Sequence, residues 1–314
     1  MPRQDALCCP LLPPLLPEVK PRTSGRAGIT TTLCGVFDRI RRGWELTKMS
    51  WGVIRSHPGM ARLPLTGGAL ALLAFVVLGL PGAALLASED AGPQIGGALL
   101  VAVGAYLGSF AVIYYNVALA AAADAALAGR QPDIGAAKAV ARSRLSVIAA
   151  WAIVSVVVSL ALSVLRDRAG VLGNVTASIG GAIWSLVTFL VVPVLAFEGI
   201  GPIAAMKRSA SLFRQRWGQQ VTGNVVIGGI AGLAVVIGVA LAVGGLVLLA
   251  AGSAAGIAGG GVLLLVGVVV AVGGAVFGGA TRGVFGVALY RYVAEDRVVG
   301  PFTPQDLEAA AKPA

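Results

Sequence analysis

Uninterrupted apolar segments recur along the chain, and they constrain its fold more than any other feature. A helix needs about 20 apolar residues to cross a hydrocarbon core, and six segments reach that length. They are Leu63 to Leu86, Ile95 to Ala123, Leu145 to Leu165, Val171 to Phe197, Val221 to Ala251, and Ile257 to about Ala280. Barrel strands alternate apolar and polar residues, so continuous runs favour helices. We predict an all-α polytopic membrane protein, a bundle of six transmembrane helices covering residues 63–292.

The composition and the placement of charge agree with insertion into a bilayer. Only 12% of the 314 residues are charged, whereas a soluble domain carries roughly 25%. Of the 24 Lys and Arg residues, 22 fall before Leu63, between Arg130 and Arg144, between Lys207 and Arg216, or from Arg282 onward. These segments share one side of a six-span topology, and positive charge in short loops marks the cytoplasmic side. Both termini are therefore expected in the cytoplasm.

Several other classes of partner and site are not expected. The basic loops lack interleaved aromatic residues and any recognition motif, which argues against nucleic acid as a partner. The cysteines Cys8, Cys9 and Cys34 all precede the membrane region, so neither a disulfide framework nor a cysteine metal site is available in it. His57 is the single histidine, and we expect it in a turn before Pro58 rather than in a metal site. No cofactor is expected.

The first 35 residues form a tail that is expected to be disordered, because prolines interrupt it too often for a signal peptide. An amphipathic segment begins immediately after it, at Val36. This suggests that Val36 is the initiator and that the residues before it are an over-extended reading frame. The intact mass of the natural protein tests this hypothesis, and a mass that includes Cys8 would reject it.

An amphipathic interfacial helix is predicted over residues 36–62. Its apolar residues recur at helical spacing, and they are Phe37, Ile40, Trp44, Trp51 and Ile54. The basic residues lie mostly off this stripe, which suits a helix on the inner leaflet with tryptophans at headgroup depth. The alternative is a solvated helix that packs on the loops of the bundle.

A second surface helix is predicted after the fourth span, starting at Pro202, because proline at the first helical position loses no hydrogen bond. Its apolar stripe is Ile203, Met206, Ala210, Phe213 and Trp217, with Leu212 as an exception on the polar side. Basic side chains beside such a stripe can reach lipid phosphate. The candidate lipid-facing basic residues of the chain are Arg39, Arg41, Arg42, Lys48, Lys138, Lys207, Arg208, Arg214 and Arg216. A cytoplasmic tail, residues 293–314, should hold a short helix starting at Pro304.

Polar residues near the inner ends of the spans are candidates for an intramembrane cluster. Ionisable groups cost roughly 2.5 to 3.5 kcal/mol at the middle of a membrane helix, so each needs an explanation. The candidates are Asn116, Asp124, Glu198, Asn224, Arg282 and Arg291. We interpret the charged members as ion pairs, Arg282 or Arg291 with Glu198 or Asp124, that hold helix ends together. A proton or cation relay is the alternative.

Glycines in the last two spans stand four residues apart, as in Gly228 with Gly232, Gly274 with Gly278, and Gly279 with Gly283. This spacing removes side-chain bulk from one helix face and favours close packing or dimerisation. In a chain with 44 glycines such pairs also arise by chance.

No metal-binding, nucleophile or phosphate-loop motif occurs in the sequence, so we predict that the protein is not an enzyme. The first hypothesis is a structural or accessory membrane protein whose basic inner face contacts anionic phospholipid headgroups, a membrane protein partner or a second copy of the chain. The second is a small-solute or ion transporter or channel that uses the polar cluster. A faint repeat, "IGAAKAVARS" and "IAAMKRSASL", motivates the second, because transporters commonly contain internal repeats.

Three stretches carry a family resemblance: "FDRIRRGWELTKMSWGVIRSHP", "VVPVLAFEGIGPIAAMKRSASLFRQRWGQQVTGN" and "ALYRYV". Over roughly Val36 to Ala310, the chain resembles a group of uncharacterised six-span membrane proteins found mainly in actinobacteria and described only as a domain of unknown function. The resemblance implies a bacterial cytoplasmic membrane location, six spans and a start near Val36. It implies no activity.

Overall fold

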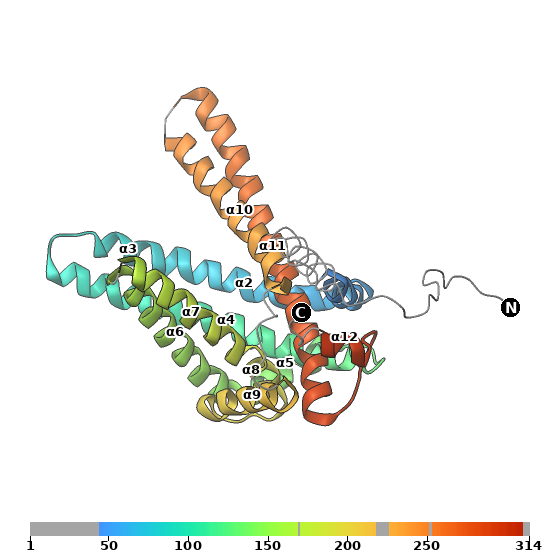
Figure 1. Ribbon diagram of the computed structural model, residues 1–314. Helices are drawn as coiled ribbons and strands as arrows, with labels where there is room; N and C mark the ends of the chain where they lie inside the picture. Colours follow the sequence, from blue (N-terminus) through green and yellow to red (C-terminus); the bar gives the residue numbers. More distant parts are fainter. Residues whose placement is uncertain (1–43, 169, 218–225, 251–252, 310–314) are drawn as a thin grey trace, which may run out of the picture. The chain divides into compact units, whose positions relative to one another are not determined.

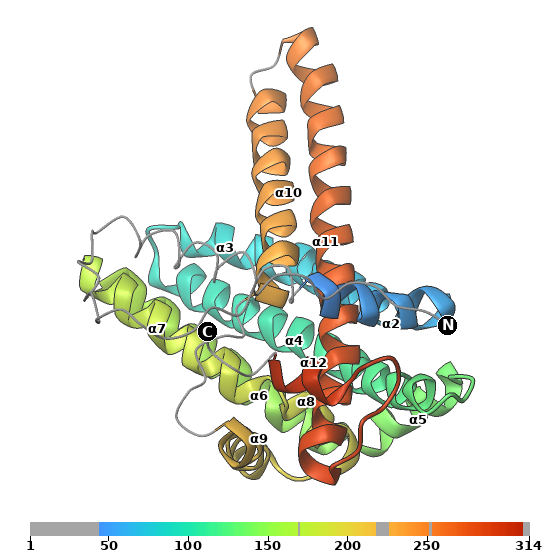
Figure 2. The same cartoon turned by 45° about the vertical axis from the view of Figure 1, so that its right-hand side comes forward.

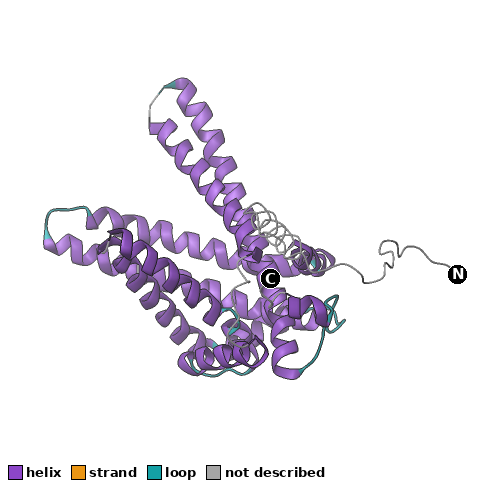
Figure 3. Ribbon diagram, in the orientation of Figure 1, coloured by secondary structure: helices purple, strands orange, loops and turns teal. Residues whose placement is uncertain are grey.

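The computed structural model describes residues 44–168, 170–217, 226–250 and 253–309, all of which belong to one unit, Arg39–Ala314. Every regular element in these ranges is helical, and no strand occurs among them (Figure 3). The N-terminal tail with the Val36 start, Asn224, and the basic residues Arg39, Arg41 and Arg42 lie outside the described ranges.

The helix at residues 44–56 packs against the bundle along one face. Leu46 and Ile54 are buried there, and the ring of Trp51 lies 4.8 Å from the ring of Phe277. Trp44, which was predicted on the same stripe, is 40% exposed. The buried face is therefore rotated away from Trp44, because the contact with Phe277 determines which side of the helix is covered.

The first apolar segment forms one helical run, Pro58–Leu86. It consists of η1 (Pro58–Ala61), α2 (Arg62–Ala74), the π-helical turn η2 (Phe75–Gly79) and α3 (Leu80–Leu86). The Leu80 N–H donates to the Phe75 carbonyl, five residues back, just before Pro81. Proline has no N–H to donate, and the wider π turn lets the helix continue through this position.

The long helix α4 (Ala91–Leu127) returns beside this run and packs against α2 and α3 (Figure 1). Glycines make the approach close near the loop that joins them. A Cβ placed on Gly82 would lie 2.8 Å from the carbonyl oxygen of Gly97, and a Cβ on Gly97 would lie 2.6 Å from that of Gly82. The two backbones therefore touch where any side chain would separate them.

The next three helices follow as α5 (Ile134–Ser143), α6 (Leu145–Arg168) and α7 (Gly170–Thr188). Asp133 caps α5, because its carboxylate accepts a hydrogen bond of 2.7 Å from the Gly135 N–H. The α6 and α7 helices pack on each other (Figures 1 and 2), and the stacked rings of Trp151 and Trp184 lie 5.6 Å apart between them.

The fourth predicted span, Val171 to Phe197, is divided in two. After α7 the chain turns at Phe189 and Leu190, and α8 (Val191–Phe197) begins. Pro193 explains the break: in a continuous helix it would leave the Phe189 carbonyl without a donor, and its ring would clash with that carbonyl. In the first turn of α8 the proline is tolerated.

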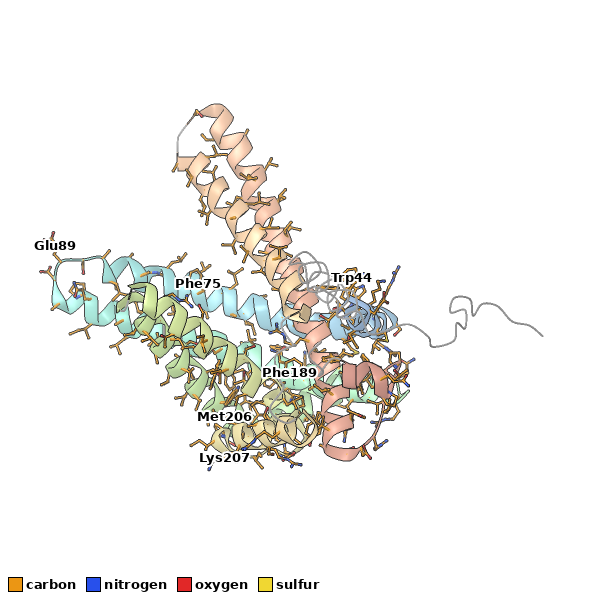
Figure 4. All side chains as sticks on the ribbon, viewed as in Figure 1. Trp44, Phe75, Glu89, Phe189, Met206 and Lys207 are labelled. Atoms are coloured by element: carbon orange, nitrogen blue, oxygen red, sulfur yellow. The ribbon has the colours of Figure 1, made fainter. Side chains whose placement is uncertain are left out.

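Helix α9 (Pro202–Trp217) begins at the predicted proline, but its buried face differs from the predicted stripe. Ala205, Ser209 and Leu212 are fully buried, whereas Ile203 is 68% exposed. Ala205 and Ser209 have small side chains, which let this face of α9 approach the bundle closely. The bulkier Met206 (labelled in Figure 4) lies outside this face and is half-buried. The side chains of Phe213 and Trp217 lie outside the described part.

Helices α10 (Val226–Ala250) and α11 (Ala254–Glu295) form an antiparallel pair (Figures 1 and 2). They meet through Gly238 and Gly245 on α10 and Gly260 and Gly267 on α11. A Cβ on Gly260 would lie 2.7 Å from the carbonyl oxygen of Gly245, whereas a Cβ on Gly232 would meet nothing within 4 Å. This contact uses glycines seven residues apart, or about two turns on one helix face, and Gly232 of the predicted pairs takes no part in it.

After α11 the chain folds back on the bundle. Phe302 is buried with its ring 6.0 Å from that of Phe285, and the short helix α12 (Pro304–Ala309) buries Leu307. The helix begins at Pro304, as predicted. The segment also packs on the core, which was not predicted.

Five helices in the described ranges are long and apolar enough to cross a membrane: Pro58–Leu86, Ala91–Leu127, Leu145–Arg166, Gly232–Ala250 and Gly256–Glu295. The divided fourth segment is not among them. Large apolar side chains stand exposed along these helices, among them Leu73, Val77, Val157, Val236, Val262 and Leu265. Apolar surface on this scale suits hydrocarbon and not water. The chain is therefore a multi-pass helical membrane protein.

Candidate functional site

The buried core lies where α4, α8 and α11 meet, and charged residues close one end of it. Arg291 of α11 donates from Nε to Oδ1 of Asp124 on α4 at 2.8 Å, and the two side chains are only 18% and 21% exposed. Arg291 also pairs with Glu295 one turn along α11, and Nη2 of Arg130 lies 3.9 Å from the second Asp124 oxygen. The ion pair ties α4 to α11 directly.

A second set of contacts centres on Glu198, which follows the last residue of α8. Its Oε1 accepts from Nε of Arg208 on α9 and from the hydroxyl of Tyr290 on α11, each at 3.0 Å. One carboxylate therefore joins three helices. Hydrogen bonds to a charged acceptor are the stronger kind, about 1.5 to 3 kcal/mol each.

The turn after Glu198 depends on glycine. Gly199 has a φ of +63°, a backbone conformation that an L-residue adopts only at a cost. A side chain there would also overlap the guanidinium of Arg144, which lies across the turn. The Nε of Arg144 is buried and has no hydrogen-bond partner among the described residues.

An aromatic ring joins the two sets of contacts. The guanidinium carbon of Arg291 lies 4.6 Å from the centroid of the Phe197 ring, and the Phe197 and Tyr290 rings are 5.4 Å apart. We call this connected group the polar network, and its members are Asp124, Phe197, Glu198, Arg208, Tyr290 and Arg291. Each of its two acids accepts from a guanidinium, an arrangement suited to clamping helices together.

Arg282 and Asn116 lie elsewhere, in a cavity of about 240 Å³ bounded by α4, α7, α8 and α11. Ser185, Thr188, Phe189 and Pro193, from the break between α7 and α8, also line it (Figure 4 labels Phe189). We call this the Arg282 pocket. Within the described ranges no acidic residue lines it, and Arg282 has no ion-pair partner there. The predicted pairing of Arg282 with Glu198 or Asp124 is therefore absent, because Arg208 and Arg291 occupy those acids.

Glycines of α11 provide the space for this pocket. Gly279, Gly283 and Gly286 line it on one face of the helix. A Cβ on Gly286 would meet only Pro193, at 3.8 Å, whereas a Cβ on Gly283 would lie 2.7 Å from the Leu119 side chain. Gly283 thus permits close packing with α4, and Gly286 leaves part of the cavity open.

The candidate lipid-facing cations differ in what they contact. Lys48 pairs with Glu45 at 3.0 Å, Lys138 lies 5.8 Å from the Tyr115 ring centroid, and Arg208 belongs to the polar network. Lys207 and Arg214 are exposed and have no acidic partner in the described part of the chain. The side chain of Arg216 lies outside that part.

No group of three or more His, Cys, Asp or Glu side chains that could hold a metal ion occurs among the described residues. Two members of the polar network, Phe197 and Tyr290, were not predicted as site residues. Their contacts join positions far apart in the sequence, and no spacing pattern indicates such contacts. Ser185 was missed for the same reason.

Comparison with known proteins identifies a family but no activity. A model of the family of unknown function DUF6159 matches residues 96–300, which is more than half of the chain. No curated protein and no solved structure matches the chain.

Proposed function

Since the chain belongs to the family of unknown function DUF6159, we propose a function from its own geometry. The protein is a structural or accessory component of the bacterial cytoplasmic membrane, and its basic inner face binds anionic phospholipid headgroups. The observation that carries this proposal is the outer face of α9, where the exposed cations Lys207 and Arg214 lie beside the exposed Ile203.

The arrangement on α9 suits a helix held at a membrane surface. Its opposite face is buried against the bundle through Ala205, Ser209 and Leu212, so the helix cannot turn to hide Ile203. An apolar side chain next to exposed cations can enter the headgroup region while the cations reach lipid phosphate. Each such cation contributes about 1 kcal/mol of attraction to an anionic leaflet.

The proposal includes no catalytic step. Asp124 and Glu198, the acids nearest the core, are each held by an arginine and serve to fix helix ends. The positive-inside distribution of charge supports a cytoplasmic position for α9 and for both termini. This placement requires α7 and α8 together to form a sixth crossing, in addition to the five long helices.

Lipid retention tests the proposal. The full chain would be extracted with its native lipid, and the bound phospholipids would be measured by native mass spectrometry for wild type and for the Lys207→Gln, Arg214→Gln double variant. At about 1 kcal/mol per cation, the double variant should bind phosphatidylglycerol roughly thirtyfold more weakly. Because both side chains are exposed, the melting temperature should not change.

The matched control is Arg166→Gln, which removes an exposed cation at the far end of α6 and should leave retention unchanged. Equal retention by the double variant and wild type would reject the proposal. If a stoichiometric protein or a second copy of the chain were recovered bound at the α9 surface, that partner, and not lipid, would be the ligand of the basic face.

A transporter or channel is the second candidate, and the Arg282 pocket favours it. Asn116 of α4 and Arg282 of α11 line the pocket, and both helices are long enough to cross the membrane, whereas Ser185 comes from the broken segment of α7 and α8. Discontinuous helices of this kind form substrate sites in many transporters. Flux of a solute into proteoliposomes that is abolished by Arg282→Gln and retained in the α9 double variant would select this candidate.

A further inference from the structure

We propose that the Arg282 pocket is a binding site for a phosphate group, carried either by inorganic phosphate or by the headgroup of a phosphomonoester lipid. No part of this inference depends on lipid binding by α9. It begins from a charge without a counter-ion. Arg282 lines the cavity, while the acids that might neutralise it, Asp124 and Glu198, are paired with Arg291 and Arg208.

The Arg282 side chain is exposed, but it belongs to a helix long enough to cross the membrane, so an unpaired guanidinium there needs a partner. Arginine in a membrane helix is costly unless it pairs or reaches water, and its planar array of donors matches the oxygens of phosphate in a bidentate fashion. No carboxylate lines the pocket in the described part of the chain. An anion that enters the cavity would supply the missing acceptor.

Further donors converge on the same cavity. The side chains of Asn116 and Ser185 line it, and neither forms a side-chain hydrogen bond with a described residue. Thr188 differs, because its hydroxyl already donates to the Trp184 carbonyl at 2.7 Å. The amide of Asn116 and the hydroxyl of Ser185 can each donate one hydrogen bond to an oxyanion.

The size of the pocket limits the ligand. A volume of about 240 Å³ falls below the range of roughly 300 to 1,000 Å³ typical of sites for drug-sized molecules. It accommodates a phosphate group with a few attached atoms. The apolar walls at Phe189 and Val192 suit the first carbons of the acyl chains of a lipid, whereas inorganic phosphate would use only the polar side.

Two experimental arms separate the sources of phosphate. In the first, the full chain in nanodiscs of phosphatidylcholine is titrated with inorganic phosphate by calorimetry. In the second, phosphatidic acid is added to the nanodiscs, and its retention is measured by native mass spectrometry. Wild type should bind in one arm, and Arg282→Gln should weaken that binding roughly tenfold or more, because it removes the charged hydrogen-bond donor to the phosphate.

Three further variants test whether the ligand binds in the pocket. Gly286→Leu fills the cavity without changing its charge and should also abolish binding, whereas Arg62→Gln removes an exposed arginine outside the pocket and should leave it intact. Asn116→Asp places a carboxylate in the pocket that Arg282 lines and should exclude the anion by charge repulsion. No binding by wild type in either arm, or equal binding by Arg282→Gln, would overturn the proposal.

The α9 double variant separates this inference from the proposed function. Lys207→Gln with Arg214→Gln should lose lipid at the basic face and still bind phosphate in the pocket. Arg282→Gln should show the opposite pattern.

Discussion

Arg291 shows how one residue can organise several helices. Its guanidinium pairs with Asp124 on α4 and lies over the Phe197 ring of α8, while its own helix is α11. A lysine could satisfy the charge but not the planar contact with the ring together with the ion pair. The pairing of Arg291 with Asp124 was one of the alternatives that the sequence allowed, because both were expected at inner helix ends.

Gly199 gives a prediction at the scale of one residue. Gly199→Ala should destabilise the protein for two reasons, the positive φ and the overlap with Arg144. Gly129→Ala is the matched control, because Gly129 has a φ of +72° but a Cβ there would meet nothing within 4 Å. The control should lose about 1 to 2 kcal/mol from backbone strain alone.

The measurement is the free energy of unfolding in a mixed micelle titrated with denaturing detergent. Gly199→Ala should lose more than Gly129→Ala, and the difference reports the contact with Arg144. Equal losses would show that the Arg144 guanidinium moves aside for the added methyl group at no measurable cost.

At the scale of the element, the α10 and α11 pair depends on glycines that face each other. Gly260→Ala should push the helices apart, since its Cβ would lie 2.7 Å from a backbone oxygen and 2.9 Å from the backbone nitrogen of Leu249. Overpacking of this kind costs about 1 to 3 kcal/mol. The neighbouring change Gly261→Ala adds a methyl where nothing lies within 4 Å, and it should be neutral or stabilising.

A spin-label distance between cysteines introduced at Val243 and Val262 measures this separation, because both side chains are exposed, one on each helix. The distance in the Gly260→Ala background should exceed the distance in the Gly261→Ala background. Equal distances in both would contradict the close approach of the helices at Gly260.

The elements also show where sequence reasoning succeeds. The apolar runs predicted the helices well, because length and hydropathy alone determine which segments can cross a bilayer. The start of α9 at Pro202 followed from proline chemistry. The sequence did not predict which face of α9 is buried. The burial of Ser209 and Leu212 depends on the shape of the bundle surface against which α9 packs. The break near Pro193 has a local cause, the proline itself, but it was not predicted because the apolar run continues through it.

At the scale of the whole molecule, the candidate site could be predicted only in part. Asp124, Glu198 and Arg291 were found because charge in an apolar helix is conspicuous. Which acid accepts from Arg208, Arg291 or Tyr290 depends on tertiary packing, which the sequence does not show. The Arg282 pocket was not predicted, since a cavity requires knowledge of which small residues, such as Gly286, face one another. The possible repeat of α5 and α9 stays a prediction.

The central claim is that the chain spans the membrane with α9 and the polar network on the cytoplasmic side. It is tested by labelling single cysteines with an impermeant thiol reagent, in a background where Cys8, Cys9 and Cys34 are serine. Glu89→Cys, in the loop between α3 and α4 (Figure 4), should react in intact protoplasts. Lys207→Cys should react only after the membrane is permeabilised. Labelling of Lys207→Cys in intact protoplasts would contradict the account.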